Sequence, residues 1–186
     1  TGMVEQILQF ASLRSGRRQY NLRAARIDEI IEHTLAKLLP RIEAAGFQVE
    51  KDIGAATPLV NVDAAALEQC IQNLVNNALK YSGDSRWLGV RTGVAEGQRG
   101  TEGLITVEDR GIGIEPADLP HLFDPFYRGR AVAAAQIHGT GLGLSTTREI
   151  AVAMKGSISV KSTPGKGSAF TLHFPALPPV KAAASV

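Results

Sequence analysis

The sequence is poor in cysteine and in aromatic residues. Among 186 residues there are one cysteine, one tryptophan and two methionines, and aromatic residues make up 5% of the chain. Cys70 has no second cysteine with which to form an internal disulfide, so a disulfide-stabilised secreted fold is excluded. No apolar run approaches the ~18 residues of a membrane-spanning helix, and no secretory signal opens the chain. A reducing, cytoplasmic setting fits these absences.

Neither sign of charge dominates the chain. Lys and Arg number 20 against 18 Asp and Glu, which gives a formal net charge of +2. This balance does not indicate nucleic acid or an acidic membrane as the main partner, because both select strongly basic surfaces. The apolar fraction of 44% and the length are those of one soluble globular domain with a substantial core.

Two common phosphate-binding motifs are also missing. No G-x-x-x-x-G-K-[ST] sequence occurs, because Gly165 and Lys166 have no glycine at the required upstream position, so this is not a P-loop protein. The glycines between His138 and Ser145 lack the G-x-G-x-x-G spacing and follow a loop rather than a strand. A dinucleotide-binding fold is therefore not indicated.

Residues 67–81 form the stretch around which the chain is organised. Their apolar residues recur at the i, i+3, i+4 spacing of an amphipathic helix, with Asp63 as a candidate N-cap. Asn73, Asn77 and Lys80 fall in one narrow sector, away from the centre of the apolar stripe. Carboxamide oxygens suit Mg²⁺ and an ammonium suits a phosphate, although a solvated polar face is the alternative for this helix alone.

The remaining pattern predicts an α+β, two-layer sandwich. Helices are expected at 27–45 and 144–155, and strands at 20–23, 48–53, 58–62, 87–94, 103–109, 157–162 and 168–174. The 87–94 and 103–109 strands are expected to form an antiparallel hairpin with a long, turn-rich loop at 95–101. Residues 1–15 have a helical spacing without a cap, which fits either the end of a longer helical hairpin or an ordinary N-terminal helix. Residues 175–186 read as a frayed tail.

Three further stretches contain residues suited to nucleotide chemistry. Asp109, which directly follows a strand, could accept a hydrogen bond from an exocyclic amine, and Gly111 and Gly113 would let the backbone approach a ring. Residues 139–143 alternate glycine with other residues before a helix, where exposed N–H groups could hold phosphates. Residues 122–129 are rich in aromatics and include Arg128. Each stretch taken alone also has a purely structural interpretation. Residues 109–113 would be an ordinary Asp-x-Gly turn, residues 139–143 a flexible loop that leads into a helix, and residues 122–129 a short helix packed on the core.

Taken together and in this order, the stretches resemble the ATP-binding catalytic domain of bacterial sensor histidine kinases, in the superfamily shared with gyrase, the heat-shock chaperone and mismatch-repair ATPases. Residues 73–81 resemble the N box of that family, 109–113 its G1 box, 123–126 its F box and 139–143 its G2 box. The glycine turn at 165–170 resembles the one before the family's last strand. The resemblance covers residues 26–175, and residues 1–15 resemble the tail of the preceding dimerisation helix.

The resemblance implies a Bergerat-type ATP-binding fold, with a mixed, mostly antiparallel sheet covered by helices on one face. It implies Mg²⁺ as a cofactor alongside ATP, with Asn77 as the principal ligand and Asn73 assisting, and a catalytic set of Asn73, Asn77 and Lys80. Asp109 would read adenine, and a lid would span residues 110–138. The other nucleotide-binding residues that it implies are Lys80, Tyr81, Gly111, Gly113, Phe126, Arg128, Gly139, Thr140, Gly141, Leu142 and Gly143. Arg110 stands where the family often has Asn, so a polar contact from that side chain is not carried over.

One position distinguishes the branches of this superfamily. Hydrolytic members carry a general-base Glu where this chain has Asn73, which cannot take up a proton. The site is therefore expected to hold Mg-ATP for an external nucleophile, because phosphoryl transfer requires mainly positioning and charge neutralisation.

The resemblance thus implies that residues 17–175 are the catalytic domain of a two-component sensor histidine kinase. Residues 1–16 would be the end of its dimerisation helix and residues 176–186 a disordered tail. The γ-phosphoryl of ATP would pass to a histidine on a dimerisation helix outside this fragment. The expected partners are those helices and the receiver domain of a response regulator, in a homodimeric and possible inner-membrane parent. An anti-sigma-factor-type serine kinase and a nucleotide-binding scaffold without transferase activity are the alternatives.

Overall fold

The computed structural model describes residues 18–54, 57–97, 100–129 and 139–178. Within them lie the helices α2 (Ile27–Ala44), α3 (Ala64–Tyr81) and α5 (Gly143–Ala153), and the 3-10 helix η1 (Leu119–His121). The strands are β1 (Arg23–Arg26), β2 (Gln48–Asp52), β3 (Leu59–Val62), β4 (Trp87–Gly97), β5 (Gly100–Asp109), β6 (Ser157–Thr163) and β7 (Gly167–Pro175). The expected helix at 1–15 lies outside the described residues.

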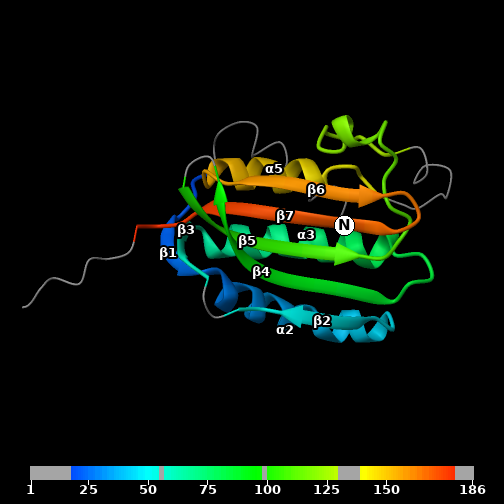
Figure 1. Ribbon diagram of the computed structural model, residues 1–186, viewed down its shortest axis with the longest axis horizontal. Helices are drawn as coiled ribbons and strands as arrows, with labels where there is room; N and C mark the ends of the chain where they lie inside the picture. Colours follow the sequence, from blue (N-terminus) through cyan, green and yellow to red (C-terminus); the bar gives the residue numbers. More distant parts are fainter. Residues whose placement is uncertain (1–17, 55–56, 98–99, 130–138, 179–186) are drawn as a thin grey trace, which may run out of the picture.

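Five strands form the main sheet in the order β2-β4-β5-β7-β6, and β1 pairs with β3 in a separate two-stranded sheet. All pairs in the main sheet are antiparallel except β2 with β4, which is parallel. Burial alternates along β5 and β7, so that one face of the sheet is covered. Figure 1 shows α3 crossing behind β5 and β7. The predicted two-layer α+β fold, with a mixed and mostly antiparallel sheet, is confirmed.

The core lies between this covered face and the helices. Its fully buried side chains come from every layer and include Ile31, Leu67, Ile71, Leu88, Ile105 and Leu172. Cys70 of α3 is buried in the same core, and burial raises the pKa of its thiol to about 12. The apolar stripe of α3 thus fixes which side of that helix is left for polar contacts.

The structure differs from the expected elements in three places. The first strand occupies Arg23–Arg26 rather than 20–23. The β4–β5 ladder continues to the pair Gly97 and Gly100, through the stretch expected to be a long loop, because backbone pairing tolerates its small and polar residues. Beyond β7, Ala176 and Leu177 donate backbone hydrogen bonds to Thr101 and Leu59 instead of fraying. The rest of the expected tail, 179–186, lies outside the described residues.

Candidate functional site

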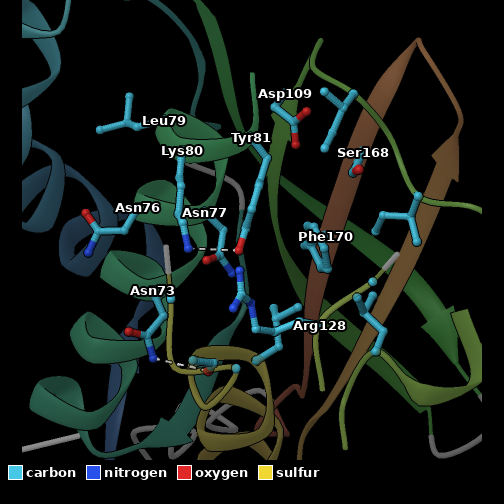
Figure 2. Close-up of a pocket in the computed structure, with 18 of the residues that line it drawn as sticks. Asn73, Asn76, Asn77, Leu79, Lys80, Tyr81, Asp109, Arg128, Ser168 and Phe170 are labelled. Atoms are coloured by element: carbon cyan, nitrogen blue, oxygen red, sulfur yellow. Dashed lines mark hydrogen bonds between the residues drawn. The ribbon is translucent and has the colours of Figure 1, made fainter. Parts of the chain in front are cut away.

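A cavity of about 650 Å³ opens at one end of α3. Its walls come from α3, the ends of β5 and β7, and the two loops at 112–129 and 139–143. Of the sequence-predicted residues, the lining includes Asn73, Asn77, Lys80, Tyr81, Asp109, Gly113, Arg128, Gly139, Thr140, Gly141 and Gly143. Residues as far apart in the sequence as Asn73 and Phe170 therefore meet around one space (Figure 2).

The N-terminus of α3 is capped by a side chain that also contacts the segment before β1. Asp63 is the N-cap: its Oδ1 accepts a hydrogen bond from the N–H of Ala66 at 3.0 Å, and its Oδ2 accepts one from the N–H of Asn21 at 2.9 Å. Burial alone would raise the pKa of Asp63, but these backbone donors outweigh it and lower that pKa. The predicted cap is confirmed, and it ties the start of the helix to the segment before β1.

The opposite end of α3 presents three polar side chains to the cavity. Figure 2 shows Asn77, Lys80 and Tyr81 projecting into the same space. Lys80 Nζ donates a hydrogen bond to the Tyr81 hydroxyl at 3.0 Å and lies 4.8 Å from the centre of that ring. A Cβ at Gly139 would collide with Lys80 Nζ, so the ammonium lies directly against the glycine loop. A cation is thus placed where that loop exposes its backbone.

Asn73 joins α3 to α5. Its Nδ2 donates to the carbonyl of Gly143 and to the hydroxyl of Thr147, both at 3.3 Å. Thr147 Oγ1 in turn donates to the same carbonyl at 2.9 Å. The amide nitrogen of Asn73 therefore fixes the first turn of α5 against the middle of α3.

Asp109 is the buried acid of the cavity. It ends β5 on the covered face of the sheet, and 6% of its surface is exposed. Its Oδ1 accepts a hydrogen bond from the N–H of Gly111 at 2.8 Å. Burial raises the pKa of this carboxyl, although the backbone donors of Gly111 and Ser168 oppose the rise. A carboxylate in this position is a strong acceptor in a space of reduced polarity.

The two glycines after Asp109 have different places. Gly113, at φ +66°, lines the cavity, whereas Gly111 does not and packs against the end of α3 instead. A Cβ at Gly111 would collide with the carbonyl of Tyr81, and one at Gly113 with that of Thr163. The expectation that Gly111 lines the pocket is therefore not met, because its lack of a side chain serves close backbone packing.

The aromatic loop and the glycine loop are joined to each other. Phe126 and Gly141 both have positive φ, at 64° and 71°, and the Phe126 N–H donates to the Gly141 carbonyl at 3.1 Å. The Phe126 side chain is 60% exposed and does not line the cavity, nor does Leu142, which is 1% exposed. Arg128 does line it. Residues 130–138 of the expected lid lie outside the described residues.

Sequence reasoning missed several lining residues. Arg41, Asn76, Ile112, Ser168 and Phe170 also border the cavity. Asn76 Oδ1 is buried without a hydrogen-bond partner within the described part of the chain, and Figure 2 shows this side chain pointing away from Asn77. Its position three residues after Asn73 was a usable signal, since that spacing places both on neighbouring parts of the helix surface. Phe170 and Ser168 carried no such signal, because strand alternation alone does not distinguish core from cavity wall.

The described residues contain no group of three or more His, Cys, Asp or Glu side chains placed to hold a metal ion. Nor is any helix among them both long enough and apolar enough to cross a membrane.

Residues 62–178 match the family described as histidine kinase-, DNA gyrase B-, and HSP90-like ATPase. Sensor-like histidine kinase SenX3 of Mycobacterium tuberculosis is 32% identical over 175 residues, which are 94% of this chain and 42% of that protein. Phosphate regulon sensor protein PhoR of Pseudomonas aeruginosa is 37% identical over 64% of this chain and 26% of its own length. The chain thus spans less than half the length of these curated relatives.

Solved structures of histidine kinases have a similar fold. Histidine kinase AdeS of Acinetobacter baumannii superposes with a TM-score of 0.71 at 25% identity, covering 93% of this chain and 76% of that one. Full-length ShkA has a TM-score of 0.76 at 23% identity over 94% of this chain and 35% of its own, a likeness of fold. The resemblance to sensor histidine kinase catalytic domains is therefore confirmed, and the chain belongs to the family of histidine kinase-, DNA gyrase B- and HSP90-like ATPases.

Proposed function

We propose that the cavity binds ATP, with the adenine at Asp109. The observation that carries this proposal is that one cavity joins a buried carboxyl, Asp109, to the ammonium of Lys80 and the carboxamide of Asn77. The carboxylate would accept a hydrogen bond from the adenine amino group, and Ile112, Ile114 and Phe170 supply apolar wall for the ring. The related ShkA structure is described as a complex with AMPPNP, a nucleotide of this class.

The phosphates would lie between Lys80, Arg128 and the glycine loop at 139–143. The N–H groups of that loop and the N-terminus of α5 favour anions, and Lys80 Nζ already lies against Gly139. The residues present also fit Mg²⁺, since amide oxygens are hard ligands and phosphate oxygens complete such sites. Asn77 would be the principal protein ligand. Asn73 would assist through its oxygen, because its nitrogen is bonded to α5.

The chemistry proposed is transfer of the γ-phosphoryl group to a histidine on a dimerisation helix of the parent protein. A bound Mg²⁺ would neutralise phosphate charge, while Lys80 and Arg128 orient the phosphates and Asp109 fixes the base. From there the group would pass to the receiver domain of a response regulator, in a homodimeric parent. The names of the relatives, sensor histidine kinases with full-length chains more than twice as long as this one, favour this over an anti-sigma-factor-type serine kinase.

Isothermal titration calorimetry with ATP and Mg²⁺ tests the proposal. Asp109→Ala should weaken binding roughly tenfold to a hundredfold, the effect of losing one charge-assisted hydrogen bond of about 1.5–3 kcal/mol. Glu108→Ala is the matched control, because Glu108 is the neighbouring carboxylate on the other face of β5 and pairs with Arg91 at 3.5 Å. Equal affinity of the Asp109 variant and the parent chain would show that Asp109 does not read the base.

A further inference from the structure

The only tryptophan of the sequence lies on the outer face of the sheet, beside the residue that follows Asp109. The Arg110 guanidinium carbon is 3.8 Å from the centre of the Trp87 ring, close enough for a cation–π contact. The indole Nε1 donates a hydrogen bond to Glu50 Oε2 at 3.1 Å, and this bond restrains the orientation of the Trp87 side chain. Glu50 also pairs with Arg91 at 3.5 Å. The Trp87 ring is thus hydrogen-bonded to Glu50 on β2 and makes a cation–π contact with Arg110.

Gly89 gives the ring its room. Trp87 and Gly89 are two residues apart on β4, so they face the same side of the sheet. A Cβ at Gly89 would lie 2.5 Å from the nearest ring atom, which is less than any van der Waals contact allows. The edge of the indole therefore occupies the space beside Gly89, and a side chain at this position would displace it.

The contact between Trp87 and Arg110 lies just beyond the end of the β4–β5 ladder. Leu88 and Asp109 are the last residue pair of β4 and β5, and Trp87 and Arg110 are the next residues on either side. Because successive side chains of an extended chain point to opposite faces, holding Arg110 on the outer face directs Asp109 to the inner one. Burial along β5 alternates accordingly, and the exposed Arg110 follows the buried Asp109.

We propose that Trp87 and Arg110 are a positioning pair for nucleotide recognition. Their contact holds the Asp109 carboxylate at the cavity wall in the orientation that accepts a hydrogen bond from an exocyclic amine. This inference rests on the proposed function, since it assigns the pair a role in the same site. Neither residue lines the cavity, so their effect on binding is transmitted through the Asp109 backbone.

Four variants test the pair by calorimetry with ATP. Arg110→Ala and Gly89→Ala should each weaken ATP binding roughly threefold to tenfold, the factor that corresponds to a cation–π contact. Arg110→Lys should restore most of the affinity, because it keeps a cation over the ring. Gly93→Ala is the control on the same strand and face, where an added Cβ would make only ordinary contacts, at 3.9 Å, with Leu104. It should bind as the parent does.

Purine riboside triphosphate, which lacks the 6-amino group, separates positioning from general damage. If the pair orients Asp109, the variants lose affinity for ATP and not for this analogue, whereas a looser fold would weaken both. Trp87 emission should shift in Arg110→Ala and Gly89→Ala and not in Gly93→Ala. ATP bound equally well by parent and variants, or equal losses for both nucleotides, would overturn the inference and leave the proposed function standing. Failure of the parent to bind ATP would overturn both.

Discussion

The side-chain amide of Asn73 donates to the Gly143 carbonyl at 3.3 Å, and so connects the middle of α3 to the first residue of α5. The same nitrogen donates to Thr147, one turn further along α5. The position at which hydrolytic members of the superfamily carry a glutamate is therefore occupied here by a donor that joins two helices. Its partners are a carbonyl and a hydroxyl that itself donates to that carbonyl. A carboxylate could not replace it without losing both bonds.

Asn73→Glu should consequently destabilise the chain. The variant removes two donated hydrogen bonds and places a negative charge beside the Gly143 carbonyl, at a cost of about 1–3 kcal/mol. Urea unfolding of parent and variant would measure the difference. Asn73→Gln, which retains the amide donors on a longer side chain, is the control and should lose less. Equal stability of the Glu variant and the parent would show that the α3–α5 link contributes nothing.

Hydrolysis of ATP by the unmodified chain should be slow. Asn73 cannot remove a proton from water, and its nitrogen is engaged with α5 rather than with the cavity. Phosphate release measured with saturating Mg-ATP would check this. Rapid turnover by the parent chain that disappears in Asn77→Ala would instead place the protein with the hydrolytic branch.

Asp109→Asn should remove a pH-dependent loss of stability from the nucleotide-free chain. Burial raises the pKa of this carboxyl above its unfolded value, so the stability it contributes is greatest below the unfolded pKa and falls as pH rises through the folded one. An asparagine stays neutral, so its contribution to stability does not change with pH in this range. Thermal unfolding between pH 4 and 8 should therefore show a melting temperature that falls less with rising pH in the variant than in the unmodified chain, together with weaker ATP binding. The same pH dependence in both proteins would contradict this account.

Much of this architecture follows from local signals in the sequence. The stripe on α3, the cap at Asp63 and the alternation of β5 and β7 are set by short-range rules, and the structure contains all three. On α3, periodicity was enough to group Asn73, Asn77 and Lys80, but it did not find Asn76, which borders the same cavity. The loops at 109–113, 123–126 and 139–143 have no periodic pattern, and only their resemblance to the family motifs assigned them to the site.

Other features depend on residues far apart in the sequence. The Trp87 ring contacts Glu50 and Arg110, which come from two other segments, and no motif links these residues. The parallel pairing of β2 with β4 likewise requires knowing where α3 crosses. The motif predicted that Gly111 lines the pocket. In the structure it packs instead against the Tyr81 carbonyl at the end of α3, a contact that leaves no room for a side chain. Such tertiary contacts become visible only once the segments are folded against one another.

Asp63→Ala should lower the free energy of unfolding by about 1–2 kcal/mol, because the N-cap of α3 is lost. Asp63 also accepts a hydrogen bond from Asn21, so the loss should be at the upper end of the usual range. Its folded pKa is lowered, so its charge contributes stability above the unfolded pKa that is lost as pH falls through the folded one. Asp63→Asn should keep the cap and lose this acid dependence, which unfolding curves below pH 5 would show. Parallel acid dependence in parent and Asn variant would count against the assignment.

The chain by itself should not become phosphorylated on histidine. An acceptor imidazole must reach the γ-phosphoryl group, and none of the three histidines in the described segments lines the cavity. His33 on α2 lies 3.8 Å from Glu68, and His121 lies 3.0 Å from Asp124 in the aromatic loop. His173 on β7 contacts Ser159 and Glu102 on the outer face.

His138, the fourth histidine, lies outside the described residues, and the Gly-Thr that follows it is unlike an acceptor sequence, in which a carboxylate directly follows the histidine to help remove the proton. Incubation of the chain with γ-labelled ATP and Mg²⁺ should therefore leave no acid-labile, base-stable label. Under the proposed function, adding a dimerisation-helix hairpin that carries an acceptor histidine should produce this label, and Asp109→Ala should reduce the rate of labelling at subsaturating ATP. Stoichiometric labelling of the chain alone, mapped to any of its four histidines, would show that the acceptor lies within this domain.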